Sequence, residues 1–261
     1  HHRTVSSLEA RRSLIAFWSP RYWPTWLLLG WMRLAALLPF RLNVRLHAFL
    51  GGIAAAVLLP RARIARRNLE LCFPELNAPQ REDLLRRHLA AMTICLGETA
   101  FAWFAPMQRV RALLQVEGLE HLHAALRSGN GALLSTGHFT GLEITGPLLG
   151  SLTGRLTIMF SRRRNLLFDE IQVRRRRRVA QASFPKDDVR GLLRSLRRNA
   201  VVWYAADQFY RGNRAELVQF FHEPAMTNTA ISRLARLSGA AVVPFFYRRR
   251  DDDTGYVLTF H

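Results

Sequence analysis

A histidine and a glutamate five positions apart are the residues of this chain best suited to acid–base chemistry. His138 and Glu143 lie in residues 131–143, where a short apolar run is bounded by glycines and followed by polar side chains. A carboxylate that holds one imidazole nitrogen protonated leaves the other nitrogen free to act as a general base. Five positions correspond to about 140° around a helix, so the two side chains can meet only if His138 precedes the helix. A helix-capping histidine beside a surface glutamate would show the same spacing.

The elements that must carry these side chains are short buried strands. Residues 132–134 and 201–204 are apolar runs of strand length, and polar residues follow each of them. Ligands of open α/β sheets bind at the carboxyl ends of parallel strands. We therefore expect Asp207, which comes soon after the second run, on the same edge as His138. An aspartate that caps a helix would give the same pattern.

Positive charge is concentrated in five consecutive arginines at residues 174–178. On a helix, five consecutive residues span about 400°, so at most two or three of them can line one pocket. Arg174 and Arg178 would share a helix face. The other side chains of the run are expected to be solvated.

The chain lacks the sequence motifs of several other reaction classes. Ser135 is near His138, but it has no Gly-x-Ser-x-Gly elbow, and residues 129–131 lack the third glycine of a dinucleotide fingerprint. No Gly-x-x-x-x-Gly-Lys phosphate loop and no His-Glu-x-x-His pair occur. Cys72 and Cys95 are far apart and form no Cys-x-x-Cys motif. We predict no metal and no cofactor.

Composition limits the classes of partner. The chain has 261 residues, is 49% hydrophobic and carries a formal net charge of +19, from 38 basic and 19 acidic residues. Lys186 is the only lysine, and arginine suits bidentate binding of phosphates and carboxylates. A pI near 11.6 is typical of proteins that bind nucleic acid, an anionic membrane surface or an acidic protein. A preference for arginine codons would produce part of the same excess.

From residue 112 onward, strand patterns alternate with helical patterns, which predicts an α/β fold with a mixed sheet flanked by helices. The expected strands cover residues 113–116, 132–134, 156–160, 201–204, 241–246 and 256–260. The expected helices include residues 61–71, 80–104, 165–180, 187–198 and 229–237. Because the last strand lies at the end of the chain, we expect the natural protein to continue beyond it.

The N-terminal part has the composition of a membrane anchor, and we expect residues 1–60 to form anchoring helices and residues 61–261 to form the α/β domain. The apolar segment 26–40 is 15 residues long and contains Arg33, whereas a spanning helix needs roughly 20 residues. A shallow or tilted anchor is thus at least as consistent as a full span, and a soluble helical cap would also fit. Four tryptophans crowd this region, as at a membrane boundary: Trp18, Trp23, Trp26 and Trp31.

Five segments, in order, resemble the late acyltransferases of lipid A biosynthesis, the lauroyl and myristoyl transferases of Gram-negative bacteria. The His-x4-Glu pair by itself resembles the broader glycerolipid acyltransferase superfamily, and its neighbours make the resemblance specific. The segments are Pro-Arg-Tyr-Trp-Pro-Thr-Trp at 20–26, Arg-Arg-Asn-Leu-Glu-Leu-Cys-Phe-Pro-Glu-Leu at 66–76, Gly-His-Phe-Thr-Gly-Leu-Glu at 137–143, Val-Val-Trp-Tyr-Ala-Ala-Asp at 201–207, and Arg-Leu-Ala-Arg-Leu-Ser-Gly-Ala-Ala-Val-Val-Pro at 233–244.

The resemblance implies transfer of a fatty acyl chain from acyl carrier protein to a hydroxyl of a Kdo-bearing lipid A precursor. This reaction takes place at the cytoplasmic face of the bacterial inner membrane and needs no covalent intermediate. The resemblance implies His138 as the base, Glu143 as its partner and Asp207 as a further active-site acid. The Gln-x-Arg-x-Arg pattern at residues 172–176 implies Arg176 as the first candidate for an essential arginine and Arg174 as the second.

The chain departs from the family pattern at two places. Phe160-Ser-Arg162 stands where Tyr-Arg-Pro is usual, so Arg162 is displaced by one position, and we expect Arg162 and Arg164 to bind substrate with Arg174. Phe209 stands where a second acid is usual, which keeps open another anionic glycolipid or a lysophospholipid as the acceptor. A nucleic-acid-binding module would account for the charge but not for the aromatic N-terminal segment, so we expect no nucleic-acid partner.

Overall fold

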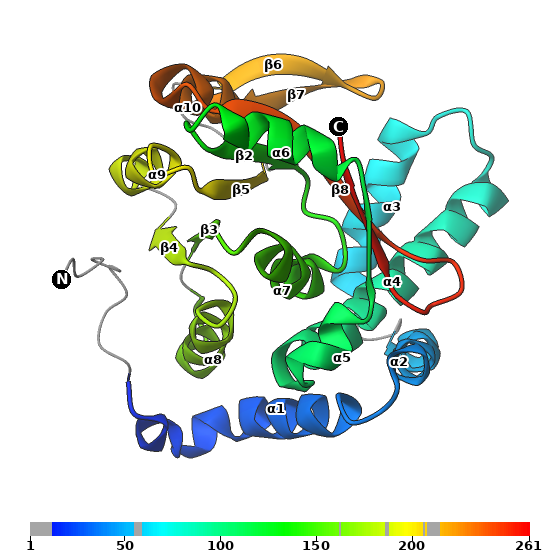
Figure 1. The fold of residues 1–261 in the computed structure, drawn as a ribbon. Coiled ribbons are helices and arrows are strands. Elements are labelled where there is room, and N and C mark those ends of the chain that lie inside the picture. The colour runs from blue at the N-terminus through cyan, green and yellow to red at the C-terminus, as the bar shows by residue number, and fades with distance from the viewer. Residues whose placement is uncertain (1–11, 55–58, 162, 186–187, 206, 208–214) are drawn as a thin grey trace.

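The computed structural model describes residues 12–54, 59–161, 163–185, 188–205, 207 and 215–261. Its centre is a seven-stranded sheet with the order β1-β9-β8-β2-β5-β3-β4 (Figure 1). Strands β8, β2, β5, β3 and β4 run parallel, β9 runs antiparallel to β8, and β1 runs parallel to β9. The expected mixed sheet with flanking helices is therefore confirmed. The strands are β1 (Leu114–Glu117), β2 (Ala132–Thr136), β3 (Leu156–Phe160), β4 (Ala182–Pro185), β5 (Val201–Ala205), β8 (Ala241–Arg249) and β9 (Tyr256–Phe260).

Helices cover both faces of the sheet, which explains why its central strands are apolar throughout. Leu134 of β2 packs in the cluster that contains the apolar face of α7 (Leu142–Thr153), whereas its neighbour Leu133 packs in the cluster of α9 (Val189–Leu196) and α10 (Ala230–Ser238). Successive side chains of a strand point to opposite faces. Both leucines are fully buried. The remaining helices of this part are α5 (Met107–Arg111), α6 (Leu119–Arg127) and α8 (Leu166–Arg176).

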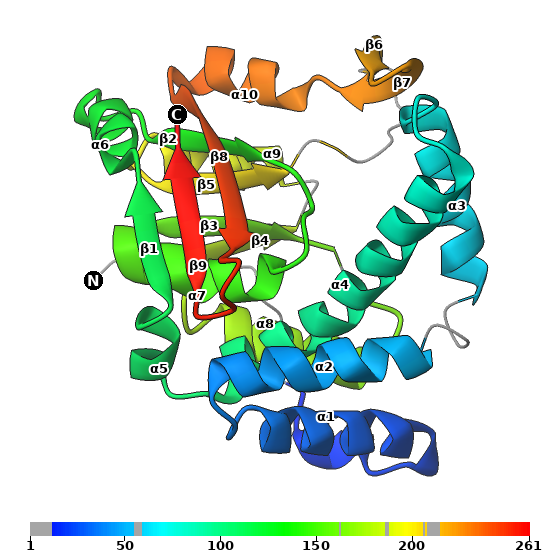
Figure 2. The same ribbon diagram turned by 90° about the vertical axis from the view of Figure 1, so that its right-hand side faces the viewer.

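The N-terminal helices form a unit beside the sheet (Figure 2). They are α1 (Trp23–Ala35), α2 (Phe40–Ala54), α3 (Leu59–Cys72) and α4 (Ala78–Phe104), preceded by two short 3-10 turns at Leu14–Phe17 and Pro20–Tyr22. Helix α4 begins with a capping box in which the side chains of Asn77 and Gln80 satisfy backbone N–H groups. Helix α4 packs against α1, α2 and α3. It also contacts α7.

The apolar segment 26–40, expected as one anchor, is divided between two helices. Helix α1 ends at Ala35, and α2 begins at Phe40 directly after Pro39, which has no N–H with which to continue a preceding helix. None of the helices in the described residues has the length and apolarity needed to cross a membrane.

Most of the expected strands are confirmed, but three were missed. Strand β4 has four residues, among them Ser183 and Pro185, so it carries little strand signal. Strands β6 (Ala215–Phe220) and β7 (Glu223–Asn228) form an antiparallel hairpin outside the main sheet. Because neither of its faces is covered by a core, the hairpin shows no regular alternation of apolar and polar residues.

Candidate active site

His138 lies in the loop between β2 and α7 and contacts Asp207, which follows β5. The ring Nδ1 is 2.6 Å from Asp207 Oδ1, and the backbone N–H of His138 donates to Oδ2 of the same carboxylate at 2.6 Å. Because β2 and β5 are adjacent and parallel, with Thr136 opposite Ala205, both residues leave the sheet at one edge. The expected position of Asp207 is thus confirmed. The side chains of the pair are 40% and 42% exposed, so a substrate can reach them.

Two glycines allow this loop to approach its neighbours. Gly141 has a φ of +83°, in the left-handed region that favours glycine. A Cβ at this position would also lie 2.5 Å from the Tyr256 hydroxyl. A Cβ at Gly137 would lie 3.1 Å from Asp207 Oδ2. The loop therefore packs closely on both sides of His138, which limits the positions that the imidazole can take.

Tyr247 supports the same loop from β8. Its hydroxyl lies 3.2 Å from the carbonyl oxygen of Gly137 and 3.4 Å from that of Phe139, so it donates to the backbone on either side of His138. Burial raises the pKa of this phenol well above its usual value, although a backbone hydrogen bond at Phe139 acts to lower it. The hydroxyl is therefore a neutral donor at physiological pH.

Replacement of Tyr247 by phenylalanine should lower the free energy of unfolding by about 1 kcal/mol, the usual net contribution of one neutral hydrogen bond. The ring contacts to Trp203 and Phe245 are retained in this variant. Since the loop loses a support but no reacting group, we expect the acyl-transfer rate to fall less than about tenfold. Urea denaturation and the initial rate measure the two effects. An unchanged unfolding midpoint would show that the two carbonyls do not depend on this donor.

Glu143, in the first turn of α7, belongs to a second, more buried cluster. Its Oε1 accepts from Arg176 Nη2 and from Gln172 Nε2, the latter at 2.8 Å, and its Oε2 accepts from Trp103 Nε1 at 3.1 Å. Burial raises the pKa of Glu143, but the charge of Arg176 and the three donors outweigh this effect and hold the pKa below its usual value. Glu143 is thus a fixed carboxylate that joins α7 to α8 and α4.

The carboxylate on the His138 ring is therefore Asp207, where the sequence suggested Glu143. His138 does precede the helix, as the expected pairing required, but the Glu143 side chain turns toward α8 and α4. The physical reason is burial. A buried carboxylate is stabilised more by the positive charge of Arg176 than by contact with a half-exposed imidazole. His138 and Glu143 therefore belong to two different clusters, although both residues lie near the start of α7.

The arginines at the end of α8 divide between different partners. Arg176 contacts Glu143, whereas Arg174 Nε bonds to Glu170 on its own helix at 2.7 Å. The guanidinium of Arg175 lies over the ring of Phe104, 4.5 Å from its centroid. Of the two arginines considered for an essential role, Arg176 is the one in contact with a site residue.

The other arginine expected to bind substrate is exposed. Arg164 lies in the connection between β3 and α8 with its side chain open to solvent. Arg162 and Phe209, the two positions at which the chain departs from the family pattern, lie outside the described residues.

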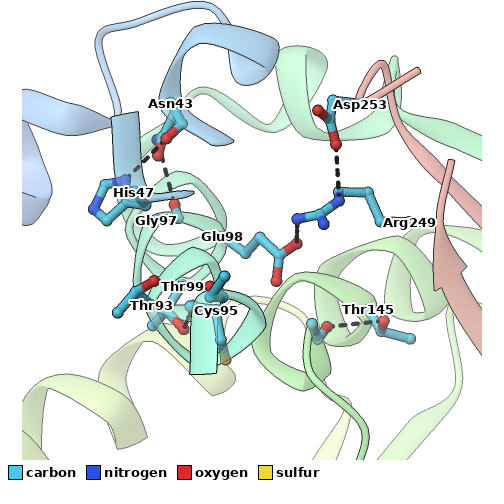
Figure 3. A network of polar contacts seen from close by, with 12 residues as sticks. Asn43, His47, Thr93, Cys95, Gly97, Glu98, Thr99, Thr145, Arg249 and Asp253 are labelled. Atoms are coloured by element: carbon cyan, nitrogen blue, oxygen red, sulfur yellow. Dashed lines mark hydrogen bonds and ion pairs between the residues drawn. The ribbon is translucent and has the colours of Figure 1, made fainter. Parts of the chain in front are cut away.

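A buried ion pair joins α4 to the sheet (Figure 3). Glu98 of α4 is only 3% exposed and bonds to Arg249 Nη1 of β8 at 3.2 Å, and Arg249 Nε contacts Asp253 at 3.0 Å. Burial raises the pKa of Glu98, even though the Arg249 guanidinium acts to lower it. This pair fixes the helix that supplies Trp103 relative to the strand that supplies Tyr247.

Three residues of the site could not be assigned from the sequence. Gln172 lies in the Gln-x-Arg-x-Arg pattern, which was the available signal for it. Trp103 and Tyr247 each lie among phenylalanines, in residues 101–104 and 245–247, and nothing in those segments distinguishes them from core residues. Their polar atoms become informative only when the fold brings α4 and β8 to the loop at His138.

The geometry suits proton transfer at the edge of the sheet. If the imidazole is neutral, its Nδ1–H donates to Asp207, and Nε2 is the nitrogen that can accept a proton. No hydrogen bond to Nε2 comes from the residues that the structure describes. The second cluster, Glu143 with Arg176, does not contact this base. Its role is structural, because it joins the helices around His138.

Comparison with known proteins identifies the family. The profile of the family described as bacterial lipid A biosynthesis acyltransferase matches residues 12–261. The chain is 36% identical over 240 residues to the lipid A biosynthesis lauroyltransferase of Escherichia coli, covering 92% of this chain and 78% of that protein. It is 35% identical over 243 residues to the palmitoleoyltransferase (93% and 79%) and 28% identical over 232 residues to the myristoyltransferase (88% and 72%) of the same organism. The chain therefore belongs to the bacterial lipid A biosynthesis acyltransferases.

Proposed function

We propose that this acyltransferase moves a fatty acyl chain from acyl carrier protein to a hydroxyl of a Kdo-bearing lipid A precursor, with His138 as the general base. The observation that carries the proposal is the His138–Asp207 contact at the open carboxyl edge of the sheet. This arrangement fixes the tautomer in which Nε2 is unprotonated, as a base requires. Family membership supports the acyl-transfer reaction.

In the proposed mechanism, the acceptor hydroxyl attacks the thioester carbonyl carbon while His138 Nε2 takes the hydroxyl proton. The tetrahedral intermediate then collapses to the ester and expels the thiolate, which takes the proton back from the imidazolium. Asp207 stabilises the imidazolium formed between these steps because its carboxylate already contacts Nδ1. No acyl-enzyme is required.

The charged residues around the base have separate proposed roles. The Glu143–Arg176 pair holds the first turn of α7, and with it the His138 loop, in place. Arg164, exposed next to β3, is the proposed contact for an acceptor phosphate, together with Arg162. Arg174 is a weaker candidate for substrate binding than the sequence suggested because its guanidinium is bonded to Glu170.

We also propose that the surface of α1 and α2 lies on the cytoplasmic face of the inner membrane, in the plane of the interface. Five apolar residues here are each more than half exposed: Trp23, Leu27 and Leu34 of α1, Leu37 between the helices and Phe49 of α2. The spacing of the three in α1 follows one helix face. Arginines between them would face lipid phosphates. The acceptor is a lipid, so a protein lying on the interface can take it directly from the membrane.

The variant Leu27→Glu/Leu34→Glu should bind vesicles of phosphatidylglycerol and phosphatidylethanolamine at least about tenfold more weakly than the unaltered protein, because burial of one leucine contributes roughly 1.5–3 kcal/mol. The matched control is Leu217→Glu/Val218→Glu, which changes two exposed apolar residues on β6. Co-sedimentation of protein with vesicles measures the effect. Equal losses in both variants would contradict a specific role of the α1–α2 surface.

The proposed reaction is tested by supplying purified protein with lauroyl- or myristoyl-acyl carrier protein and a Kdo-bearing tetraacyl lipid A precursor in detergent micelles. Mass spectrometry should find the acceptor heavier by one acyl group less the hydroxyl hydrogen that it replaces. A parallel reaction with a lysophospholipid acceptor tests the alternative that the unusual residue Phe209 keeps open. Acylation of the lysophospholipid alone would replace the lipid A precursor as the proposed acceptor.

A further inference from the structure

A group of exposed arginines lies on the outer surfaces of α9 and α10, away from the catalytic cluster. These two helices pack against each other and against the same face of the sheet through Leu192, Leu196 and Leu234. Their outward side chains include six arginines, all exposed, which we call the arginine face. It consists of Arg190, Arg194, Arg197 and Arg198 on and directly after α9, and Arg233 and Arg236 on α10.

The arginine face differs from the other basic helices because it lacks acidic neighbours. Helix α4 pairs Arg86 and Arg87 with Asp83, and α8 pairs Arg174 with Glu170. Helices α9 and α10 contain no acidic residue, and no ion pair joins the arginine face to a carboxylate in the part of the chain that the structure describes. Asp188, which precedes α9, is occupied as its N-cap and accepts from Gly191. Among the described residues, no carboxylate therefore neutralises the positive charge of this face locally.

Both helices begin at the catalytic edge of the sheet. Helix α9 follows the carboxyl end of β4, and α10 is followed by β8, which runs parallel to β2 and starts at the opposite edge. The amino ends of α9 and α10 thus lie toward the edge that carries His138. Arg190 and Arg233 lie in the first half of their helices, so this surface extends from the catalytic edge along one side of the molecule.

Helix α10, which carries part of the arginine face, lies far from the apolar surface proposed to contact lipid. In both views α10 lies at the opposite end of the molecule from α1 (Figures 1 and 2). If α1 and α2 lie on a membrane, α10 projects into the aqueous phase. A face in this position is placed to meet a soluble anionic partner rather than anionic lipid. The exposed apolar residue Leu237, directly after Arg236, suits a protein partner better than a phosphate backbone.

We propose that the arginine face is the docking surface for the acidic carrier protein that delivers the acyl thioester to His138. This inference rests on the proposed function, because it names the surface that would recognise the donor of that reaction. Carboxylates on the partner would pair with guanidinium groups at the rim of the interface. Such contacts speed association and orient the partner with its acyl group toward the catalytic edge.

The test compares two charge-reversal variants that alter the net charge equally. Arg190→Glu/Arg194→Glu changes the arginine face, and Arg61→Glu/Arg63→Glu changes two exposed arginines of α3. Binding of apo-acyl carrier protein, which has no acyl group, is measured by titration at low and moderate salt. We expect the dissociation constant to rise at least about tenfold for the α9 variant, less at moderate salt, and to stay within about twofold for the α3 variant.

Activity assays separate this inference from the proposed function. With acyl-acyl carrier protein as donor, the α9 variant should show a raised KM and an unchanged kcat, because the catalytic groups are intact. With acyl-coenzyme A as a donor without the carrier, the variant and the unaltered protein should have equal rates. Absence of transfer from both donors in the unaltered protein would refute the proposed function, while the titration would still report on carrier binding.

Three results would overturn the docking surface. Equal loss of carrier binding in both variants would mean that only the total charge matters. Unchanged carrier binding in the α9 variant would place the carrier elsewhere. Loss of binding to anionic vesicles or to duplex DNA in the α9 variant, with carrier binding unchanged, would assign the arginine face to a membrane or to nucleic acid.

Discussion

Replacement of His138 by alanine should lower the acyl-transfer rate by a factor of about 10² to 10⁴, the usual contribution of a positioned general base. The imidazole is held at Nδ1 by Asp207, which leaves Nε2 as the ring nitrogen that faces a substrate in the proposed mechanism. Its side chain is 40% exposed, so its removal leaves no buried cavity, and water can solvate Asp207 in its place. Initial rates in the micelle assay measure the effect. A rate within tenfold of the unaltered protein would end the assignment of His138 as base.

Asp207→Asn provides the companion to this variant. Asparagine keeps the size of the side chain but cannot stabilise the imidazolium by charge, so the rate should fall in the same direction. If the two residues act as one unit, the double variant His138→Ala/Asp207→Asn should be no slower than His138→Ala alone. Independent, additive losses would contradict a shared role. Circular dichroism and the unfolding midpoint confirm that each variant is folded.

Replacement of Arg176 by alanine should lower the free energy of unfolding by about 3–5 kcal/mol, as expected when one partner of a buried ion pair is removed. The side chains of Arg176 and Glu143 are 19% and 13% exposed, so water cannot fully replace the guanidinium. Gln172 and Trp103 would remain as donors, but neither carries a charge. Urea denaturation at pH 7 measures the loss.

The pH dependence of this loss follows from the pKa of Glu143. In the unaltered protein the pKa is lowered, so ionised Glu143 contributes stability above its unfolded pKa of about 4.3, and this contribution is lost as the pH falls through the folded pKa. Without Arg176, burial is no longer opposed by a positive charge, so the pKa should be raised and ionisation should cost stability. The difference between the two proteins should therefore shrink between pH 7 and about pH 4.

Two controls make this prediction specific. Arg86→Ala removes an exposed ion pair with Asp83 and should lower the stability much less than Arg176→Ala, because solvent screens exposed pairs. In a Glu143→Gln background, the Arg176→Ala change should cost clearly less than in the unaltered protein, because no buried anion is left unpaired. A pH-independent loss of equal size in both backgrounds would show that Arg176 acts through packing alone.

Sequence patterns determined the central architecture because it depends on local chemistry. Buried strands must be apolar, and the glycines at 131 and 141 turn the chain with a positive φ that other residues adopt less easily. The positions of β2, β3 and β5 were therefore predictable, as was the shared edge of His138 and Asp207. The four residues of β4 and the β6–β7 hairpin were not, because short or uncovered strands carry little pattern.

The sequence by itself determined that this chain carries a histidine and two carboxylates near the carboxyl ends of buried strands, and that it resembles a family of lipid A acyltransferases. Only the tertiary structure decided which carboxylate contacts the imidazole. His138 and Glu143 are neighbours in sequence, but Asp207 reaches the ring because β2 and β5 pair side by side, and Glu143 turns away because burial requires the charge of Arg176. Pairings of this kind depend on contacts between distant segments, and residue spacing within one segment does not encode them.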